Sequence, residues 1–364
     1  MTDTRAVVED AIRAGTCLGV QVRVMLRGQT VMDFAVGEES PHVPLTTGSV
    51  VPWFSASKLL ATLAFARAWE LGILSPNDLV SQHLPEFTGG GKDSITIKHL
   101  WAHTAPLRAA DRAAGGAFAQ GWDALIALIC AADADPGWVA GQRAAYLGHA
   151  GYLLIAEIIA RRSGAAFADF LHAQVTEPLG LTAALGGMSG VRVVQVPYLG
   201  PAAAAARVAQ FDVAQGYPSA CVAGPFGEAA TAVEVLRMGG RYGGRRLLRD
   251  ETCAALVSDH RPAGVVDEAM GVPVRWGLGL MLDSFDFGRH CSPRTFGHTG
   301  GSACLVLADP DAEVTIAAHF NGNAPLQDRI RRDHALCTAV YTDLALARPK
   351  DPGRDHTAPV LGRI

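Results

Sequence analysis

The sequence is short of charged and aromatic residues, and it has no long apolar run. Of its 364 residues, 18% are charged, 7% are aromatic and 49% are hydrophobic. The formal net charge is −4, and the Lys and Arg residues are scattered, which argues against a nucleic-acid partner. No apolar run reaches the roughly 18 residues that a membrane helix needs, and the first ten residues lack the apolar stretch of a secretory signal. We therefore expect a globular, cytoplasmic protein without a nucleic-acid or membrane partner.

The seven cysteines and twelve histidines form no recognisable metal or redox motif. There is no CxxC pair and no HExxH sequence, and an odd number of cysteines cannot all pair within one chain. We expect reduced, mostly buried thiols, no metal ion and no other cofactor. The cysteines are Cys17, Cys130, Cys221, Cys253, Cys291, Cys304 and Cys337.

Both ends of the chain carry strand patterns. Apolar and polar residues alternate over 20–26, and residues 27–29 turn the chain into a second run over 31–36. A similar pair lies near the other end, at 304–307 and 314–317. These patterns predict an antiparallel sheet that is built from both chain ends.

The middle of the chain predicts helices. Residues 55–71 have apolar side chains at helical spacing and stop at Gly72. Similar patterns cover 97–102, 122–132, 151–162 and 167–174, with a last helix over about 326–347. We expect an α/β lobe formed by residues 1–54 and 205–348, a mainly helical lobe formed by 55–204, and a loosely held tail at 349–364. The candidate site then lies in a cleft between the lobes.

Ser55 and Lys58 open the first of these central helices. Residues i and i+3 of a helix share a face, so the Lys58 amine can reach the Ser55 hydroxyl and activate it as a nucleophile. Burial and the helix N-terminus would both lower the pKa of that amine. The simpler alternative is that Ser55 only caps the helix.

Two further segments can complete such a site. Tyr146 precedes the helix at 151–162, where its phenol can relay a proton beside a lysine or can simply pack against the helix. His298-Thr299-Gly300-Gly301 precedes a strand, and its glycines let a ligand approach the backbone closely. The Gly301 and Ser55 amides could then form an oxyanion hole.

With these motifs in this order, the chain resembles the group of class C β-lactamases, D-aminopeptidases and family VIII carboxylesterases. Their motifs are S-x-x-K, a Y-x-N-like segment and K/H-T-G, which correspond here to Ser55–Lys58, Tyr146–Gly148 and His298–Gly300. The similarity extends over residues 10–345 and includes accessory stretches at 95–104, 177–181 and 275–279.

The resemblance implies an α/β fold of the β-lactamase and penicillin-binding-protein type. An antiparallel sheet with flanking helices is joined to an all-helical lobe, and the active site lies between them. Ser55 is then the nucleophile, Lys58 and Tyr146 transfer protons, and the amides of Ser55 and Gly301 form the oxyanion hole. The candidate substrate-binding residues are His298, Thr299, Gly300, Trp53, His149 and Trp276. Trp53 has the alternative role of packing in the wall of the site.

Two departures from the family pattern bear on the substrate. Gly148 replaces the asparagine of Y-x-N, with His149 beside it, and His298 stands where penicillin-processing members usually have Lys. Because histidine is mostly neutral near pH 7, the site loses a fixed cation that suits a β-lactam carboxylate. Both departures favour an ester over a β-lactam as the substrate.

The sequence therefore predicts an esterase-like acyl-enzyme hydrolase with a small-molecule ester as acyl donor and water as acceptor. An amine or alcohol acceptor would make it a transacylase, and the sequence does not separate the two. The motifs are also compatible with a β-lactamase, a D-aminopeptidase or a non-catalytic penicillin-binding module. The sequence leaves the oligomeric state open.

Overall fold

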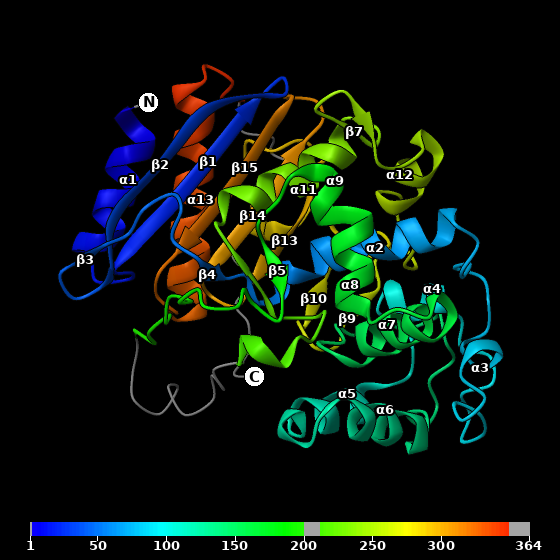
Figure 1. The fold of residues 1–364 in the computed structure, drawn as a ribbon. Helices are drawn as coiled ribbons and strands as arrows, with labels where there is room; N and C mark the ends of the chain where they lie inside the picture. Colours follow the sequence, from blue (N-terminus) through cyan, green and yellow to red (C-terminus); the bar gives the residue numbers. More distant parts are fainter. Residues whose placement is uncertain (1, 200–211, 349–364) are drawn as a thin grey trace.

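A single antiparallel sheet lies at the centre of the computed structural model, which describes residues 2–199 and 212–348 (Figure 1). Its strand order is β11-β12-β13-β14-β15-β1-β2-β3. The N-terminal strand β1 pairs with β15 from the other end of the chain, as the alternating patterns predict. The strands of this sheet are β1 (Gly19–Leu26), β2 (Gln29–Ser40), β3 (Val43–Pro44), β11 (Arg275–Trp276), β12 (Met281–Leu282), β13 (Phe296–Gly300), β14 (Cys304–Asp309) and β15 (Val314–Phe320).

Helices cover both faces of the sheet. The helices α1 (Thr2–Arg13) and α13 (Leu326–Asp343) pack together on one face, and α11 (Gly227–Arg237) covers the other (Figure 1). Alternate residues of a strand point to opposite faces. In β14, Leu305 and Leu307 accordingly join the core beneath α13, whereas Val306 belongs to the core beneath α11. The central strands are buried on both faces and are apolar for that reason.

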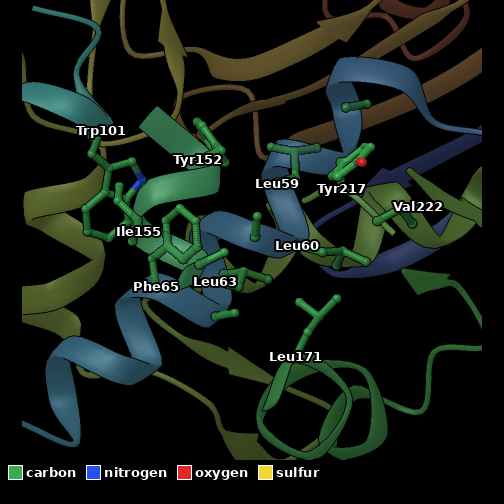
Figure 2. Packing of buried hydrophobic residues seen from close by; sticks show 14 of the residues in the cluster. Leu59, Leu60, Leu63, Phe65, Trp101, Tyr152, Ile155, Leu171, Tyr217 and Val222 are labelled. Carbon is green, nitrogen blue, oxygen red and sulfur yellow. The ribbon is translucent and has the colours of Figure 1, made fainter. Parts of the chain in front are cut away.

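A group of helices packs beside the α11 face and around the central helix α2 (Ser57–Glu70). Figure 2 shows Leu60 and Leu63 of α2 among apolar side chains from several of these helices. Phe65 packs edge-on against Trp101 and tilted against Tyr152, with ring centroids 5.7 and 5.3 Å apart. The other helices of this group are α3 (Val80–His83), α4 (Ile97–Trp101), α5 (Arg108–Gly115), α6 (Trp122–Ala131), α7 (Ala150–Ser163), α8 (Phe167–Leu171) and α9 (Glu177–Leu179).

Short elements complete the chain. The strands β4 (Val51–Pro52), β5 (Ala184–Leu185) and β6 (Val222–Gly224) form a small sheet in the order β4-β6-β5. Strand β4 of this sheet lies directly before the candidate nucleophile. The remaining elements are β7 (Arg241–Tyr242), β8 (Arg245–Arg246), α12 (Asp250–Leu256), β9 (Val266–Asp267) and β10 (Val272–Pro273).

The predicted fold class is confirmed by this antiparallel sheet with flanking helices and a large helical part. The division into two lobes stays a prediction. Its boundary at 204/205 and the tail at 349–364 lie outside the described residues. Within the described ranges, no helix combines the length and the apolar character that crossing a bilayer requires.

Candidate active site

Ser55 lies on a tight turn between β4 and α2. The α-helix was expected to begin at Ser55, but a 3₁₀ turn over Phe54–Ala56 comes first and the α-helix begins at Ser57. Phe54, immediately before Ser55, has a φ of 47°, a left-handed conformation that is uncommon for an aromatic residue. Such strain persists only where the surrounding structure enforces it, and it often marks functional sites.

Lys58 is fully buried in the first turn of α2. Its Nζ donates a hydrogen bond to the carbonyl of Ser219 at 2.9 Å and lies 3.4 Å from the Ser55 Oγ. The same Nζ sits over the ring of Tyr146, 5.3 Å from its centroid. The structure therefore brings the three predicted catalytic side chains together.

Burial lowers the pKa of the Lys58 ammonium from 10.5 to about 7, against the opposing attraction of Asp111 and Cys221. A large part of Lys58 is then a neutral amine near pH 7, and a neutral amine can accept the proton of Ser55.

The backbone of Tyr146 is held by a buried carboxylate. The Tyr146 N–H donates to Asp267 Oδ1 at 3.0 Å, and Asp267 forms a fully buried ion pair with Arg261 at 2.9 Å. Burial raises the pKa of the Tyr146 phenol, and Ser55 lies close enough to lower it in part. The hydroxyl has no hydrogen bond of ordinary geometry among the described residues. Tyr146 is thus a protonated phenol beside the nucleophile, suited to donate a proton.

His103 supports the same tyrosine from behind. The Leu147 N–H donates to His103 Nδ1 at 3.1 Å, which places the proton of the neutral ring on Nε2. The His103 ring packs 4.9 Å from the Tyr146 ring and 4.7 Å from the ring of Trp276. Its pKa lies well below the usual value because the ring is buried. His103 therefore acts on Tyr146 through packing and not through charge.

Asp111 in α5 is a residue that the sequence analysis missed. Its carboxylate accepts the N–H groups of Gly148 at 2.8 Å, His149 at 2.8 Å and Ala150 at 2.7 Å. These amides are at the N-terminus of α7, so Asp111 acts as a cap supplied from another helix. It fixes the segment that carries Tyr146. No local sequence pattern predicts this contact, because Asp111 is far from Gly148 in the chain.

We expect Asp111→Ala to lower the free energy of unfolding by about 2 kcal/mol, at the upper end of the range for lost helix caps, because three amides lose their acceptor. Urea unfolding followed by circular dichroism measures this change. Asp123→Ala is the matched control, since Asp123 is exposed in the first turn of α6, and it should cost less than about 1 kcal/mol. Equal losses in the two variants would contradict the capping role.

The predicted oxyanion amides lie on facing segments. Gly301 has a φ of 55°, and a Cβ on the preceding Gly300 would lie 2.4 Å from the Trp53 carbonyl and 3.1 Å from the Ala56 N. The turn after β13 therefore packs directly against the 3₁₀ turn that bears Ser55. Only glycine permits this approach.

His298 is buried beside Tyr146 and Trp276. Its ring centroid lies 6.2 Å from that of Tyr146 and 5.8 Å from that of Trp276. Burial and the charge of Lys58 lower its pKa to about 3, so His298 is neutral at physiological pH. Its Nε2 is buried without a hydrogen-bond partner among the described residues.

The remaining predicted substrate residues lie in different environments. Trp53 is fully buried and donates to the Gly224 carbonyl at 3.2 Å, which favours its packing role. His149 Nδ1 lies 3.0 Å from the hydroxyl of Ser219, the residue whose carbonyl holds Lys58. Thr299 is partly exposed on β13 and Gly300 is buried next to it. Their predicted contacts with substrate stay predictions.

A cavity of about 410 Å³ lies next to the Ser55 turn, although none of the predicted catalytic or substrate-binding side chains lines it. Phe54, the neighbour of Ser55, and Asn323, which lies against Gly301, both line it. Much of the remaining wall is aliphatic and comes from Met188, Val191 and Val194. A cavity of this size and character suits the apolar part of a small molecule. In residues 2–199 and 212–348, no group of three or more His, Cys, Asp or Glu side chains is placed to bind a metal ion.

The fold defines a serine hydrolase of the β-lactamase type. The family model described as Beta-lactamase matches residues 4–339, and the chain belongs to this family.

The individual relatives share only a low sequence identity with this chain. A putative D-alanyl-D-alanine carboxypeptidase of Escherichia coli (strain K12) is 24% identical over 334 residues, which cover 81% of this chain and 74% of that protein. The solved structure of EstCE1, a hydrolase with promiscuous acyltransferase activity, aligns with a TM-score of 0.78 at 21% identity, covering 93% of this chain and 98% of that one. A family VIII carboxylesterase aligns with a TM-score of 0.77 at 20% identity over 94% and 96% of the two chains. At these identities the solved structures show a shared fold.

Proposed function

We propose that the protein hydrolyses small-molecule carboxylic esters through an acyl-enzyme on Ser55. The observation that carries this proposal is the buried Lys58 amine, 3.4 Å from the Ser55 hydroxyl, with its pKa lowered to about 7. A fully buried lysine is costly to a fold, and a free amine beside a hydroxyl at a strained turn is what a serine nucleophile needs.

In the proposed reaction, Lys58 takes the proton of Ser55 while Oγ attacks the ester carbonyl carbon. The negative charge that forms on the carbonyl oxygen is stabilised by the N–H groups of Ser55 and Gly301. The phenol of Tyr146 gives its proton to the departing alkoxide, and the Lys58 ammonium returns a proton to Tyr146. Water then repeats the sequence at the acyl group and releases the acid and free Ser55.

Two features of the site favour esters over β-lactams. His298 is neutral with a pKa of about 3, so it supplies no cation for a β-lactam carboxylate. Gly148 has no side chain that could donate to the lactam amide. The aliphatic cavity wall beside Phe54 instead suits the uncharged acyl group of an ester.

We expect kcat/KM for p-nitrophenyl butyrate to exceed that for nitrocefin by at least about ten- to a hundredfold. A lost charge-assisted contact costs roughly 1.5–3 kcal/mol, which accounts for a difference of that size. Parallel steady-state assays with the two chromogenic substrates measure it. A nitrocefin value equal to or above the ester value would refute the ester proposal in favour of a β-lactamase.

Acyl transfer to an amine or alcohol is the second candidate. The likeness to EstCE1, described as having promiscuous acyltransferase activity, favours it. Intact-mass analysis with an ester, with and without an added amine, separates the two reactions. An amide product at the expense of free acid supports transfer, and acid alone supports hydrolysis.

We place this activity in the cytoplasm because all seven cysteines are buried thiols and none forms a disulfide. Such cysteines are typical of a reducing compartment. A purely penicillin-binding role is less favoured, since Ser55, Lys58 and Tyr146 are all present and lie close together.

A further inference from the structure

A buried guanidinium lies behind the turn that carries Gly301. Arg332 of α13 is 6% exposed and stacks on Phe320, with its central carbon 3.7 Å from the ring centroid. Its Nη2 donates a 2.7 Å hydrogen bond to the carbonyl of Ser302. Ser302 directly follows Gly301, so this hydrogen bond holds the residue next to the candidate oxyanion amide.

The turn itself fixes the direction of the Gly301 N–H. Residues 300–303 connect β13 to β14, and the Ala303 N–H donates to the Gly300 carbonyl at 3.1 Å. Because the peptide between Gly300 and Gly301 is planar, its N–H points opposite to its carbonyl. The Gly301 N–H is therefore directed out of the turn. The positive φ of Gly301 matches the first central position of a type II′ hairpin turn.

The strands on either side of the turn are held by the sheet, and Gly300 is held by its packing against the Ser55 turn, so the Gly301–Ser302 corner is the part that needs side-chain support. On one side, the Ser302 N–H lies 3.4 Å from Asn323 Oδ1, a long contact. On the other side, the Ala303 carbonyl accepts from the Phe320 N–H at 2.7 Å. Of the two side-chain hydrogen bonds to Ser302 described above, the one from Arg332, at 2.7 Å, is shorter than the one to Asn323, at 3.4 Å.

We propose that Arg332 is a positioning residue that holds the Gly300–Ala303 turn so that the Gly301 N–H faces the oxyanion formed on Ser55. This inference rests on the proposed function, because the oxyanion hole serves acyl transfer. Arg332 does not touch the substrate. A donor displaced by a fraction of an ångström still binds substrate, but it stabilises the transition state less well.

The competing explanation is that Arg332 only contributes to a buried ion network. Arg332 contacts Asp333 at 3.4 Å, and Arg329, one helical turn away, contacts Asp333 at 3.5 Å and Asp286 at 2.8 Å. Arg329 is 5% exposed, nearly the same as Arg332. Among the described residues, the ionic contacts of Arg329 are with these two aspartates and not with the turn, so Arg329 is a matched control within one helix and one network.

The test compares Arg332→Lys with Arg329→Lys, which both keep the positive charge. For p-nitrophenyl acetate, we expect Arg332→Lys to lower kcat by roughly ten- to a hundredfold with KM within about twofold. Affinity for phenylboronic acid, whose tetrahedral serine adduct places an oxygen in the oxyanion hole, should fall by a similar factor. Arg329→Lys should change kcat and boronate affinity by less than about twofold, even if its melting temperature falls.

Unchanged kcat and boronate affinity in Arg332→Lys would overturn the inference, as would equal losses in both variants. The boronate measurement needs no turnover, so it decides the role of Arg332 even if the wild-type protein fails to hydrolyse esters and the proposed function is wrong. If Arg332→Lys does not fold, Phe320→Leu removes the ring on which the Arg332 guanidinium stacks and so loosens the same hydrogen bond to the Ser302 carbonyl. The same fall in boronate affinity then supports the inference, and its absence refutes it.

Discussion

Ser55→Ala should abolish ester turnover while leaving the fold intact. The hydroxyl is the only atom group lost, and as a nucleophile it carries the whole covalent pathway, so kcat should fall by at least about 10⁴-fold. Labelling by a fluorophosphonate probe, detected as a mass increase of the intact protein, should disappear in the same variant. Circular dichroism and thermal unfolding report whether the fold is retained.

Ser57→Ala is the matched control for that variant. Ser57 lies two residues away and is fully buried, but its hydroxyl accepts the Val222 N–H at 3.0 Å instead of bonding back to its own helix. We expect this variant to lose about 1 kcal/mol of stability and to keep most of its labelling and turnover. Near-normal ester turnover in Ser55→Ala would mean that another residue is the nucleophile and would contradict the proposed mechanism.

Much of the fold follows from local patterns. The alternation over 20–26 and 31–36 predicts β1 and β2, and the helical spacing after Ser55 predicts α2. These elements form where expected because their apolar periodicity matches the faces that they bury. The α-helix starts two residues later than expected because a 3₁₀ turn precedes it, at the place where Gly300 packs against the Ser55 segment.

The supports of the candidate site were beyond the reach of sequence patterns. Asp111, Ser219 and Asp267 are ordinary polar residues in their local segments, and each gains its role through a contact with a residue far away in the chain. Ser219 holds Lys58 with a backbone carbonyl, which any residue could provide. The motifs indicate which groups react, whereas the groups that orient them depend on tertiary packing.

The environments of Lys58 and Tyr146 move their pKa values in opposite directions, and this assigns their roles. Burial disfavours the charged form of each group, so the amine becomes a better base near pH 7 and the phenol stays protonated. The sequence alone leaves Tyr146 either as a proton relay or as a side chain that packs against the helix. The structure favours Lys58 as the base and Tyr146 as the acid.

The activity should therefore depend on pH through Lys58. Only the neutral amine accepts the Ser55 proton, so kcat/KM for an uncharged ester should rise about tenfold per pH unit below pH 7 and level off above it. An initial-rate profile from pH 5 to 9 measures this. A profile that is flat across pH 6–8 would argue against Lys58 as the base.

Lys58→Met should lower turnover by at least about 10²-fold and yet make the protein more stable. The pKa of Lys58 is about 7 when folded and 10.5 in the reference state, so the unfolded chain holds its proton more tightly. This difference opposes folding by up to about 5 kcal/mol at and below pH 7, and the effect shrinks as pH rises from 7 towards 10.5. Methionine removes this unfavourable contribution, so the melting temperature should rise most at pH 6 and little at pH 10.

Lys98→Met, which replaces a lysine of α4 that is not fully buried, is the control and should show no comparable gain. A variant that is less stable than the wild type at pH 6 would show that the contacts of Lys58 outweigh its burial, and that the amine is held for structure as well as for catalysis.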